Sequence, residues 1–569
     1  MFRKPGPCSI SLFIILLSIK SLSGEIPLEY DLSIRGGIIY DGSGSPGFRA
    51  DLYIRGDSIA FIGNLEAASA EMELNASGLA VAPGFINMLS WADESLFRDG
   101  RSMSDIRQGV TLEVFGEGFS MGPLNDAMKN ELLADQSDIR YRVSWTTLGE
   151  YLDCLAARGV SPNVASFVGA TTVRIHELGY ENRAPGPEEL GRMTDLVRRA
   201  MEEGALGVSS ALIYSPACFA GTEELVALAQ AASEYGGLYI SHIRSEGDRL
   251  LEAVDELIDI TRRSAIRSEI YHLKVAGRSN WSKIDDLIKK IEMAQSQGLS
   301  ITADMYTYTA ASSGLNACLP PWIQEGGFKA MRQRLLDQEL RIRVVRDMNS
   351  PAADWENFYR YAGDQNILFV GFRDRALRPF TGKTLAQVAS LRDTDAANTV
   401  LDLVVEDNST VNAVYFLMNE ENVRRLINLP WVSFCSDARS IPAEGVFLQR
   451  STHPRAYGTF ARLLGKYVRE EQVIPLQEAV RRLTSLPAEN LRLRRRGRLE
   501  QGFFADVAVF DPAGIRDRAT YEKPHQYAEG VVHVLVNGVP VLKNGRHTGA
   551  LPGRVLRGPG WKGFEAPRR

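Results

Sequence analysis

Short apolar runs alternate along the middle of the chain with longer stretches in which apolar residues recur at helical spacing. This alternation is typical of α/β proteins built on a parallel sheet. Eight of the short runs are predicted as strands: 79–86, 110–115, 164–168, 207–211, 238–242, 269–273, 300–304 and 431–436. Eight parallel strands with helices between them predict a (β/α)8 TIM barrel, in which functional groups gather at the carboxyl ends of the strands.

The regular spacing of these strands breaks once, between residues 304 and 431, where more than a hundred residues intervene. We expect an inserted subdomain there, at about 313–430. It begins near Pro320-Pro321-Trp322, and its Arg- and Asp-rich body indicates ordered but partly exposed structure.

Both ends of the chain show the pattern of small antiparallel strands. Residues 31–63 alternate apolar runs with glycine-rich turns, and the runs at 502–510 and 531–538 mirror them. Two half-sets of this kind predict one small β-sandwich domain, formed by residues 25–80 and 497–555. In the sequence, these segments bracket a barrel domain at 81–496. Residues 556–569 are then a C-terminal tail.

The first residues resemble a secretory signal peptide over 1–24. Arg3 and Lys4 precede an apolar run at 10–19, which small residues follow. The pattern predicts a secreted or periplasmic protein. An apolar run of this length is too short to span a bilayer, although an uncleaved N-terminal anchor remains an alternative, and no second apolar run approaches membrane length.

The composition of the chain limits the kinds of partner that it can bind. The chain has 569 residues, 44% hydrophobic and 24% charged, which is an ordinary globular balance. A net charge of -5 provides no broad basic surface, so neither nucleic acid nor an anionic membrane is favoured as a partner. The four cysteines beyond the leader follow no CxxC or disulfide-framework spacing, so we expect free, mostly buried thiols. The oligomeric state does not follow from the sequence.

Polar side chains at the ends of the predicted strands indicate a metal site. His242 ends the fifth strand, His272 ends the sixth and lies thirty residues later, and Asp437 follows the eighth. Strand ends one βα unit apart are neighbours on a barrel rim. A single histidine is often a hydrogen-bonded core residue, but two at successive strand ends together with Asp437 favour metal binding.

The second strand offers a third ligand, because Glu117 follows it between two glycines. A hydrogen-bonded turn or a salt bridge is the alternative role for this carboxylate. The functional interpretation places Glu117, His242 and His272 around one Zn²⁺, with the fourth position open for water, as in catalytic zinc sites. Asp437 would accept a proton from that water and pass it to a leaving amine.

From about 32 to 554 the chain resembles the N-acyl-D-amino-acid deacylases (D-aminoacylases) of the amidohydrolase superfamily. The most similar stretches are 82–86, 106–111, Tyr271-His272-Leu273-Lys274, Asp304-Met305-Tyr306-Thr307-Tyr308, 453–460, 524–527 and 534–538. The resemblance implies a metal-dependent (β/α)8 barrel, a small β-domain built from both termini and a late insertion. It also implies amide hydrolysis of a small N-acyl amino acid.

When the family's functional residues are carried over position by position, the resemblance implies that His242 and His272 bind zinc and that Asp437 is the catalytic carboxylate. Glu117 falls where D-aminoacylases have a cysteine ligand, so an anionic ligand is kept while sulfur is exchanged for oxygen. Three residues fall at or near positions that hold the substrate carboxylate: Lys274, Tyr306 and Ser312. Arg450 and Arg455 are further candidates for substrate binding.

The chain departs from the family at the second metal. Leu89 and Trp91 replace the paired histidines of the His-x-His motif, and Ala170 stands where another histidine is expected. One zinc per chain is therefore expected. Trp91 would line the pocket and shape acyl-group selection. Asp93 and Glu94 could compensate as ligands, although loop carboxylates are more often solvated.

Three hypotheses follow. The first is a secreted or periplasmic zinc deacylase of N-acyl-D-amino acids. The second is a hydrolase of another amide on the same scaffold, such as a dipeptidase or cyclic amidase. The third is a non-catalytic binding protein, which has no reason to retain His242, His272 and Asp437 together.

Overall fold

The computed structural model describes Met1 and residues 30–65, 68–351 and 355–564; the predicted leader lies outside the described residues. Its centre is a parallel barrel made of two arcs, β8-β9-β10 and β11-β12-β13-β14-β15-β19. The strands are β8 (Phe85–Asn87), β9 (Val110–Phe115), β10 (Asn163–Ser166), β11 (Val168–Gly169), β12 (Gly207–Ala211), β13 (Leu238–His242), β14 (Arg267–Ile270), β15 (Ile301–Met305) and β19 (Val432–Phe434). Only Phe167 separates β10 from β11, so the two form one interrupted strand.

The barrel closes between its first and last strands. The Met88 amide donates to the Phe434 carbonyl at 3.4 Å, and Ser90 and Ala438 form a parallel bridge just past the strand ends. Eight strand positions therefore surround one core, which confirms the predicted (β/α)8 fold.

The first predicted strand is wrong in its extent, because the apolar run 79–86 divides at Gly84; the sixth, predicted at 269–273, is β14 at Arg267–Ile270. Strand β7 (Ala80–Pro83) pairs antiparallel with β20 (Val507–Phe510) in the terminal domain, and only β8 enters the barrel. A Cβ at Gly84 would lie 2.0 Å from Thr111 Oγ1, so the crossing between the two sheets requires glycine. Both parts are fully buried, and hydrophobicity therefore does not mark the boundary.

Helices cover the outside of the barrel. They are α1 (Ser95–Arg98), α2 (Met103–Ile106), α3 (Asp126–Asp135), α4 (Leu148–Arg158), α5 (Ala170–Leu178), α6 (Pro187–Glu202), α7 (Thr222–Ser233), α8 (Leu250–Ser264), α9 (Ile284–Ser296), α16 (Glu420–Ile427), α17 (Arg455–Arg462), the π-helical η7 (Leu463–Glu470), α18 (Leu476–Leu483) and α19 (Ser485–Asn490). In α8 the buried Leu250, Val254, Leu257 and Thr261 recur at helical spacing and face the core. No helix within the described ranges is long and apolar enough to cross a membrane.

The terminal domain contains two sheets, ordered β5-β4-β1-β6 and β23-β22-β21-β20-β7-β2-β3. Their strands are β1 (Tyr30–Arg35), β2 (Ile38–Ile39), β3 (Phe48–Arg49), β4 (Asp51–Arg55), β5 (Ser58–Gly63), β6 (Ala70–Asn75), β7, β20, β21 (Val531–Val536), β22 (Val539–Lys543) and β23 (Arg546–His547). Leu52 and Ile54 of the first sheet share a buried cluster with Val507 and Leu535 of the second. Strands from both chain ends thus form the predicted β-sandwich.

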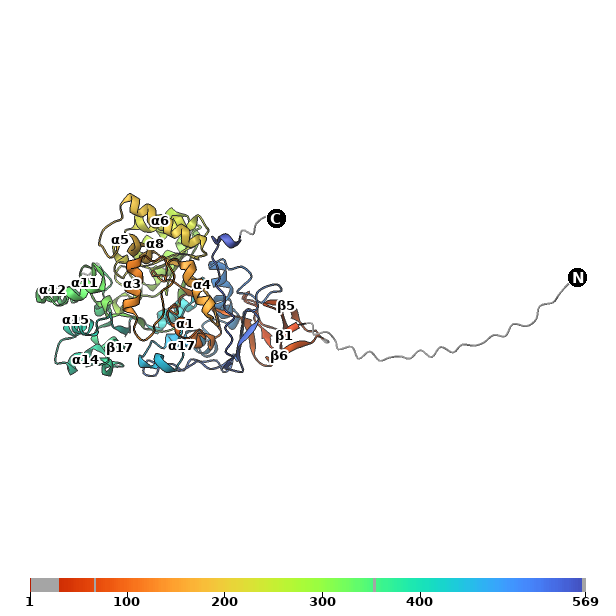
Figure 1. Cartoon of the computed structure of the whole chain (residues 1–569). Helices are drawn as coiled ribbons and strands as arrows, with labels where there is room; N and C mark the ends of the chain where they lie inside the picture. Colours follow the sequence, from red (N-terminus) through yellow and green to blue (C-terminus); the bar gives the residue numbers. More distant parts are fainter. Residues whose placement is uncertain (2–29, 66–67, 352–354, 565–569) are drawn as a thin grey trace.

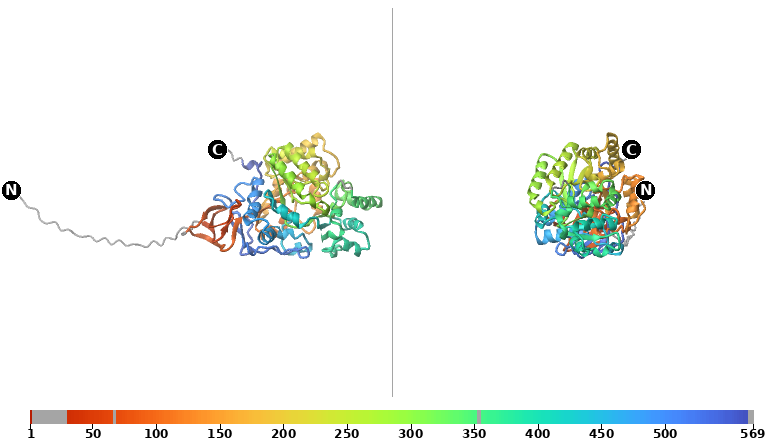
Figure 2. Two further views of the ribbon diagram at one scale, coloured as in Figure 1. Left: turned by 180° about the vertical axis from the view of Figure 1, so that it is seen from behind. Right: turned by 90° about the vertical axis from the view of Figure 1, so that its left-hand side faces the viewer.

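The segment between β15 and β19 contains a small antiparallel sheet ordered β16-β18-β17 and several helices. Its elements are β16 (Ala311–Gly314), α10 (Pro321–Gln324), α11 (Gly327–Arg334), α12 (Gln338–Met348), α13 (Phe358–Ala362), β17 (Ile367–Gly371), α14 (Leu385–Leu391), α15 (Ala396–Asp407) and β18 (Asn412–Tyr415). Helices α11, α12, α14 and α15 project at the end of the molecule opposite β1, β5 and β6, as both side views show (Figures 1 and 2). The insertion and the β-sandwich therefore flank the barrel.

The four cysteines beyond the leader are free thiols, as the sequence predicts: Cys318 and Cys435 are buried, and Cys154 and Cys218 are half-buried.

Candidate metal and catalytic site

Three side chains predicted as metal ligands converge at the carboxyl ends of the barrel strands. Glu117 Oε1 lies 2.9 Å from His242 Nδ1 and 2.8 Å from His272 Nε2. All three residues are buried, and their ligand atoms lie within 4.8 Å of one another. His242 Nε2 is buried without a hydrogen-bond partner. One carboxylate and two imidazoles form a donor set suited to zinc, so these residues fit a metal ion.

The backbone around two of these residues adopts uncommon conformations. Glu117 lies between Gly116 (φ 101°) and Gly118 (φ 67°), where a Cβ on Gly116 would stand 2.5 Å from the Phe167 carbonyl oxygen. His272 itself has φ 35°, and its amide donates to Asp304 Oδ1 at 2.7 Å. Positive φ in a residue other than glycine is costly and often accompanies function, so Asp304 holds the turn that presents the imidazole.

The protonation of His272 and that of Glu117 depend strongly on the charges of their neighbours. Burial and Lys274 oppose protonation of His272, but Glu117, Glu246 and Asp437 outweigh them and raise its pKa to about 10. Burial favours the neutral form of Glu117, yet the two imidazoles hold the pKa of its carboxyl well below the usual range. A cation that binds here must therefore displace a proton from His272, as expected for a ligand set that must deprotonate.

A second carboxylate, Glu246, adjoins the ligands and was not predicted from the sequence. Glu246 Oε1 lies 3.1 Å from His272 Nδ1 and 2.5 Å from Lys274 Nζ. The Lys274 ammonium is also 2.7 Å from His272 Nδ1. Glu246 follows His242 by four residues in the loop after β13, and that proximity in sequence was the available signal. Its contacts orient the His272 ring from the side opposite Glu117.

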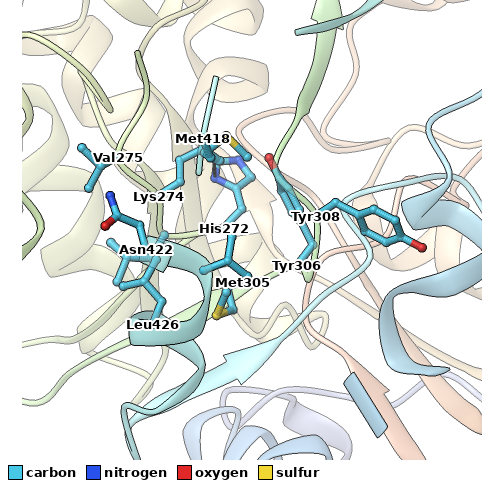
Figure 3. A pocket seen from close by; sticks show the side chains of 11 residues that line it. His272, Lys274, Val275, Met305, Tyr306, Tyr308, Met418, Asn422 and Leu426 are labelled. Carbon is cyan, nitrogen blue, oxygen red and sulfur yellow. Dashed lines mark hydrogen bonds between the residues drawn. The ribbon is translucent and has the colours of Figure 1, made fainter. Parts of the chain in front are cut away.

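Figure 3 shows the His272 ring between Lys274 and Tyr306. A cavity of about 10 Å³ borders these side chains and extends toward Met418 and Asn422. That volume has room for about one water molecule.

Asp437 lies beside this group in the loop after β19, with φ 47°. Its Oδ1 accepts a hydrogen bond from Trp91 Nε1 at 3.1 Å, and its Oδ2 lies 2.8 Å from Arg455 Nη1 in an ion pair. Burial raises the pKa of the Asp437 carboxyl, against the opposing charges of Arg455 and His272. A buried carboxylate with raised pKa is suited to accept and return a proton.

The side chains at the positions where the resemblance implies second-metal histidines offer no ligand. Leu89 is buried, and Ala170 is a buried residue at the start of α5. The carboxylate of Glu94 accepts a hydrogen bond from Tyr141 and pairs with Arg439, while Asp93 caps the Glu94 amide. Among the described residues, neither carboxylate joins the group formed by Glu117, His242 and His272.

The predicted substrate-binding residues separate into two sets. Tyr306 is buried, its hydroxyl has no hydrogen-bond partner, and the Arg455 guanidinium stacks 4.6 Å from its ring centre. Ser312 lies on β16, where its hydroxyl donates to the Ala413 carbonyl at 3.1 Å. Arg450 Nε lies 2.8 Å from Asp138 Oδ2. Lys274 and Tyr306 thus adjoin the metal ligands, whereas these contacts of Ser312 and Arg450 do not reach them.

The insertion contacts the loop that carries Glu246. Glu356 Oε2 accepts a hydrogen bond from Ser245 Oγ at 2.7 Å, and its Oε1 accepts one from the Glu246 amide at 2.8 Å. Burial raises the pKa of the Glu356 carboxyl to about 8, with the Ser245 hydrogen bond opposing. A mostly protonated carboxyl at neutral pH therefore connects the insertion to the barrel rim.

We expect Glu356→Gln to weaken the pH dependence of folding stability. The raised folded pKa means that stability is fully present below the unfolded pKa, near 4.5, and is lost as the pH rises through about 8. Glutamine cannot ionise; its carbonyl oxygen can accept the bond from the Glu246 amide, while its NH2 group faces the Ser245 hydroxyl, which can accept as it would from the O–H of a protonated carboxyl. In denaturant unfolding, raising the pH from 5 to 8 should lower the free energy of unfolding of the wild type more than that of Glu356→Gln, by about 1 kcal/mol or more.

The matched control is Glu500→Gln, which changes an exposed glutamate in the same way. It should follow the wild type at every pH. If Glu356→Gln and Glu500→Gln show the same slope, the Glu356 carboxyl does not carry this dependence.

A closed (β/α)8 barrel with a buried carboxylate-imidazole group at its strand ends is the architecture of metal-dependent hydrolases. Comparison with known proteins supports this class of protein. Residues 142–542 match the model of the amidohydrolase family, and the chain belongs to that family. The sequence-based expectations for family, fold and hydrolase class are confirmed.

Similar proteins share most of the chain's length. A D-aminoacylase of Alcaligenes xylosoxydans xylosoxydans is 34% identical over 534 residues, 93% of this chain and 97% of the relative. The structure of an N-acyl-D-glutamate deacylase of Bordetella bronchiseptica, in complex with zinc and a phosphonate mimic of the tetrahedral intermediate, has a TM-score of 0.76 at 31% identity. It covers 93% of this chain and 99% of that one. A D-aminoacylase structure, described by one-metal activation and second-metal attenuation of a binuclear centre, has a TM-score of 0.78 at 30% identity, over 93% of this chain and all of that one.

Proposed function

We propose that the protein is a zinc-dependent deacylase that hydrolyses N-acyl-D-amino acids to a carboxylate and a free D-amino acid. The observation that carries the proposal is the convergence of Glu117, His242 and His272 beside Asp437 at the mouth of the barrel. The similarity to deacylases over nearly the whole chain supports the substrate class.

Glu117, His242 and His272 would hold one zinc per chain. When bound, the zinc supplies Lewis-acid polarisation of the amide carbonyl and lowers the pKa of water. Glu246 orients His272 through its Nδ1 side, so that Nε2 faces Glu117. The chain thereby fixes the ring before the ion binds, which limits the reorganisation that binding requires.

Asp437 would transfer the proton. Its buried carboxylate accepts a proton from the attacking water and donates it to the leaving nitrogen, so that the amine departs uncharged. Arg455 holds one oxygen of this carboxylate in place by an ion pair. Burial raises the pKa of the Asp437 carboxyl, which favours its acceptance of a proton from water.

Lys274 and Tyr306 would bind the substrate α-carboxylate. The Lys274 ammonium and the unpartnered Tyr306 hydroxyl both lie within the group around His272. A cation and a hydroxyl suit an anion in a buried site. Ser312, Arg450 and Trp91 stay predictions as substrate contacts, and secretion or periplasmic location stays a prediction from the leader sequence.

Hydrolysis of N-acetyl-D- and N-acetyl-L-amino acids by the purified protein tests this proposal, with metal content measured on the same sample. We expect D-selective release of free amino acid by protein that contains zinc. Turnover should also be much slower with N-acetyl amines that lack the α-carboxylate. Absence of turnover on every N-acetyl-D-amino acid by zinc-loaded protein would refute the substrate class.

A further inference from the structure

We propose that Trp91 is a positioning residue that holds the catalytic carboxylate of Asp437, and that no second metal ion binds beside it. The inference rests on the proposed function, because it assigns Asp437 the role of proton acceptor. This role is distinct from lining the substrate pocket, because it depends on the hydrogen bond from the indole N–H to the Asp437 carboxylate.

Backbone pairing brings Trp91 and Asp437 together. The Asp437 amide donates to the Leu89 carbonyl at 2.9 Å, and the Trp91 amide donates to the Ala438 carbonyl at 3.0 Å. These bonds extend the barrel closure past β8 and β19. Trp91, which occupies the position of the second histidine in the expected His-x-His motif, is therefore held against the loop that contains Asp437.

The two oxygens of Asp437 have separate partners. Oδ1 accepts the Trp91 Nε1 hydrogen bond at 3.1 Å, and Oδ2 pairs with Arg455 at 2.8 Å. A carboxylate held at both oxygens cannot rotate freely. Hydrogen bonds to an ionised group rank among the stronger ones in proteins, so the indole contributes to the orientation of Asp437.

An indole cannot replace histidine as a metal ligand, because its nitrogen carries a hydrogen and offers no lone pair. Leu89 has no donor atom either. A second cation near Asp437 would lack both of these ligands and would compete with Trp91 for Oδ1. Trp91 thus orients the Asp437 carboxylate through its N–H group. Excess zinc should therefore not inhibit this enzyme by binding at that position.

Trp91→Phe tests the positioning role, because it keeps an aromatic ring and removes the N–H donor. We expect kcat to fall about 10-fold, which corresponds to one hydrogen bond to a charged group. KM should change less than about 2-fold, and zinc content should remain as in the wild type. The control is Trp431→Phe, which removes another half-buried indole, whose N–H donates to Glu292 away from the site, and should leave both constants unchanged.

A rise in KM with unchanged kcat would overturn the positioning role and assign Trp91 to the substrate wall instead. Unchanged kcat and KM would overturn it as well. If the wild type does not hydrolyse N-acyl-D-amino acids at all, the proposed function fails, and the following metal measurement still decides the second half of the inference.

Metal stoichiometry tests the exclusion of a second ion without any turnover. We expect the dialysed wild type and Trp91→Phe to retain one zinc per chain, even after exposure to a large excess. A wild type that binds two zinc ions would contradict the inference.

Discussion

His272→Ala should lose tight zinc binding and reduce kcat/KM by at least about 1000-fold. The variant leaves only Glu117 and His242 of the group whose ligand atoms lie within 4.8 Å. Metal catalysis contributes several kcal/mol of transition-state stabilisation, and each 1.36 kcal/mol is a factor of ten in rate. The measurements are zinc per chain after dialysis and steady-state hydrolysis of an N-acetyl-D-amino acid.

A matched control is His176→Ala, which removes a half-buried imidazole from α5. It should retain zinc and activity. Glu117→Gln serves as a second ligand variant, because it preserves the size of the side chain and removes its charge. Full zinc content and wild-type activity in either ligand variant would show that the Glu117, His242 and His272 group does not hold the catalytic metal.

Asp437→Asn should retain zinc and lose about 100- to 10,000-fold in kcat, the usual contribution of general acid-base catalysis. The amide has the shape of the carboxylate but cannot accept the proton. Because Asp437 is not one of the three clustered ligands, zinc content should match the wild type. KM should change little if the side chain acts only on the chemical step.

The control for this variant is Asp153→Asn, an exposed position whose carboxylate pairs with Arg557. It should behave as the wild type. An Asp437→Asn enzyme within a few fold of wild-type kcat would remove Asp437 from the mechanism, whereas loss of zinc in this variant would make it a ligand.

The barrel and the convergence of Glu117, His242 and His272 could be predicted because their signals are local. Strands β12 and β13 coincide with the predicted runs 207–211 and 238–242, and the spacing of His242 and His272 by one βα unit places them at the ends of neighbouring strands. Glu117 was identified from its position between two glycines after an apolar strand. Each of these inferences needs only strand order and the rule that parallel strands end at one mouth.

The contacts around these ligands could not be predicted, because they join segments far apart in the sequence. Glu356 of the insertion bonds to the loop after β13, and Trp91 bonds to Asp437 across the barrel closure. Glu246 is close in sequence to His242, but only the fold shows that it faces His272. The division of the first predicted strand at Gly84 depends likewise on a close approach to Thr111.

On the proposed mechanism, one zinc held by Glu117, His242 and His272 is sufficient for deacylation. Titration of zinc into the metal-free protein tests it most directly, with hydrolysis of an N-acetyl-D-amino acid measured at each addition. Activity should rise linearly to one equivalent per chain and then stay level. Activity that appears only as a second equivalent binds, or that never appears with one zinc bound, would contradict the claim.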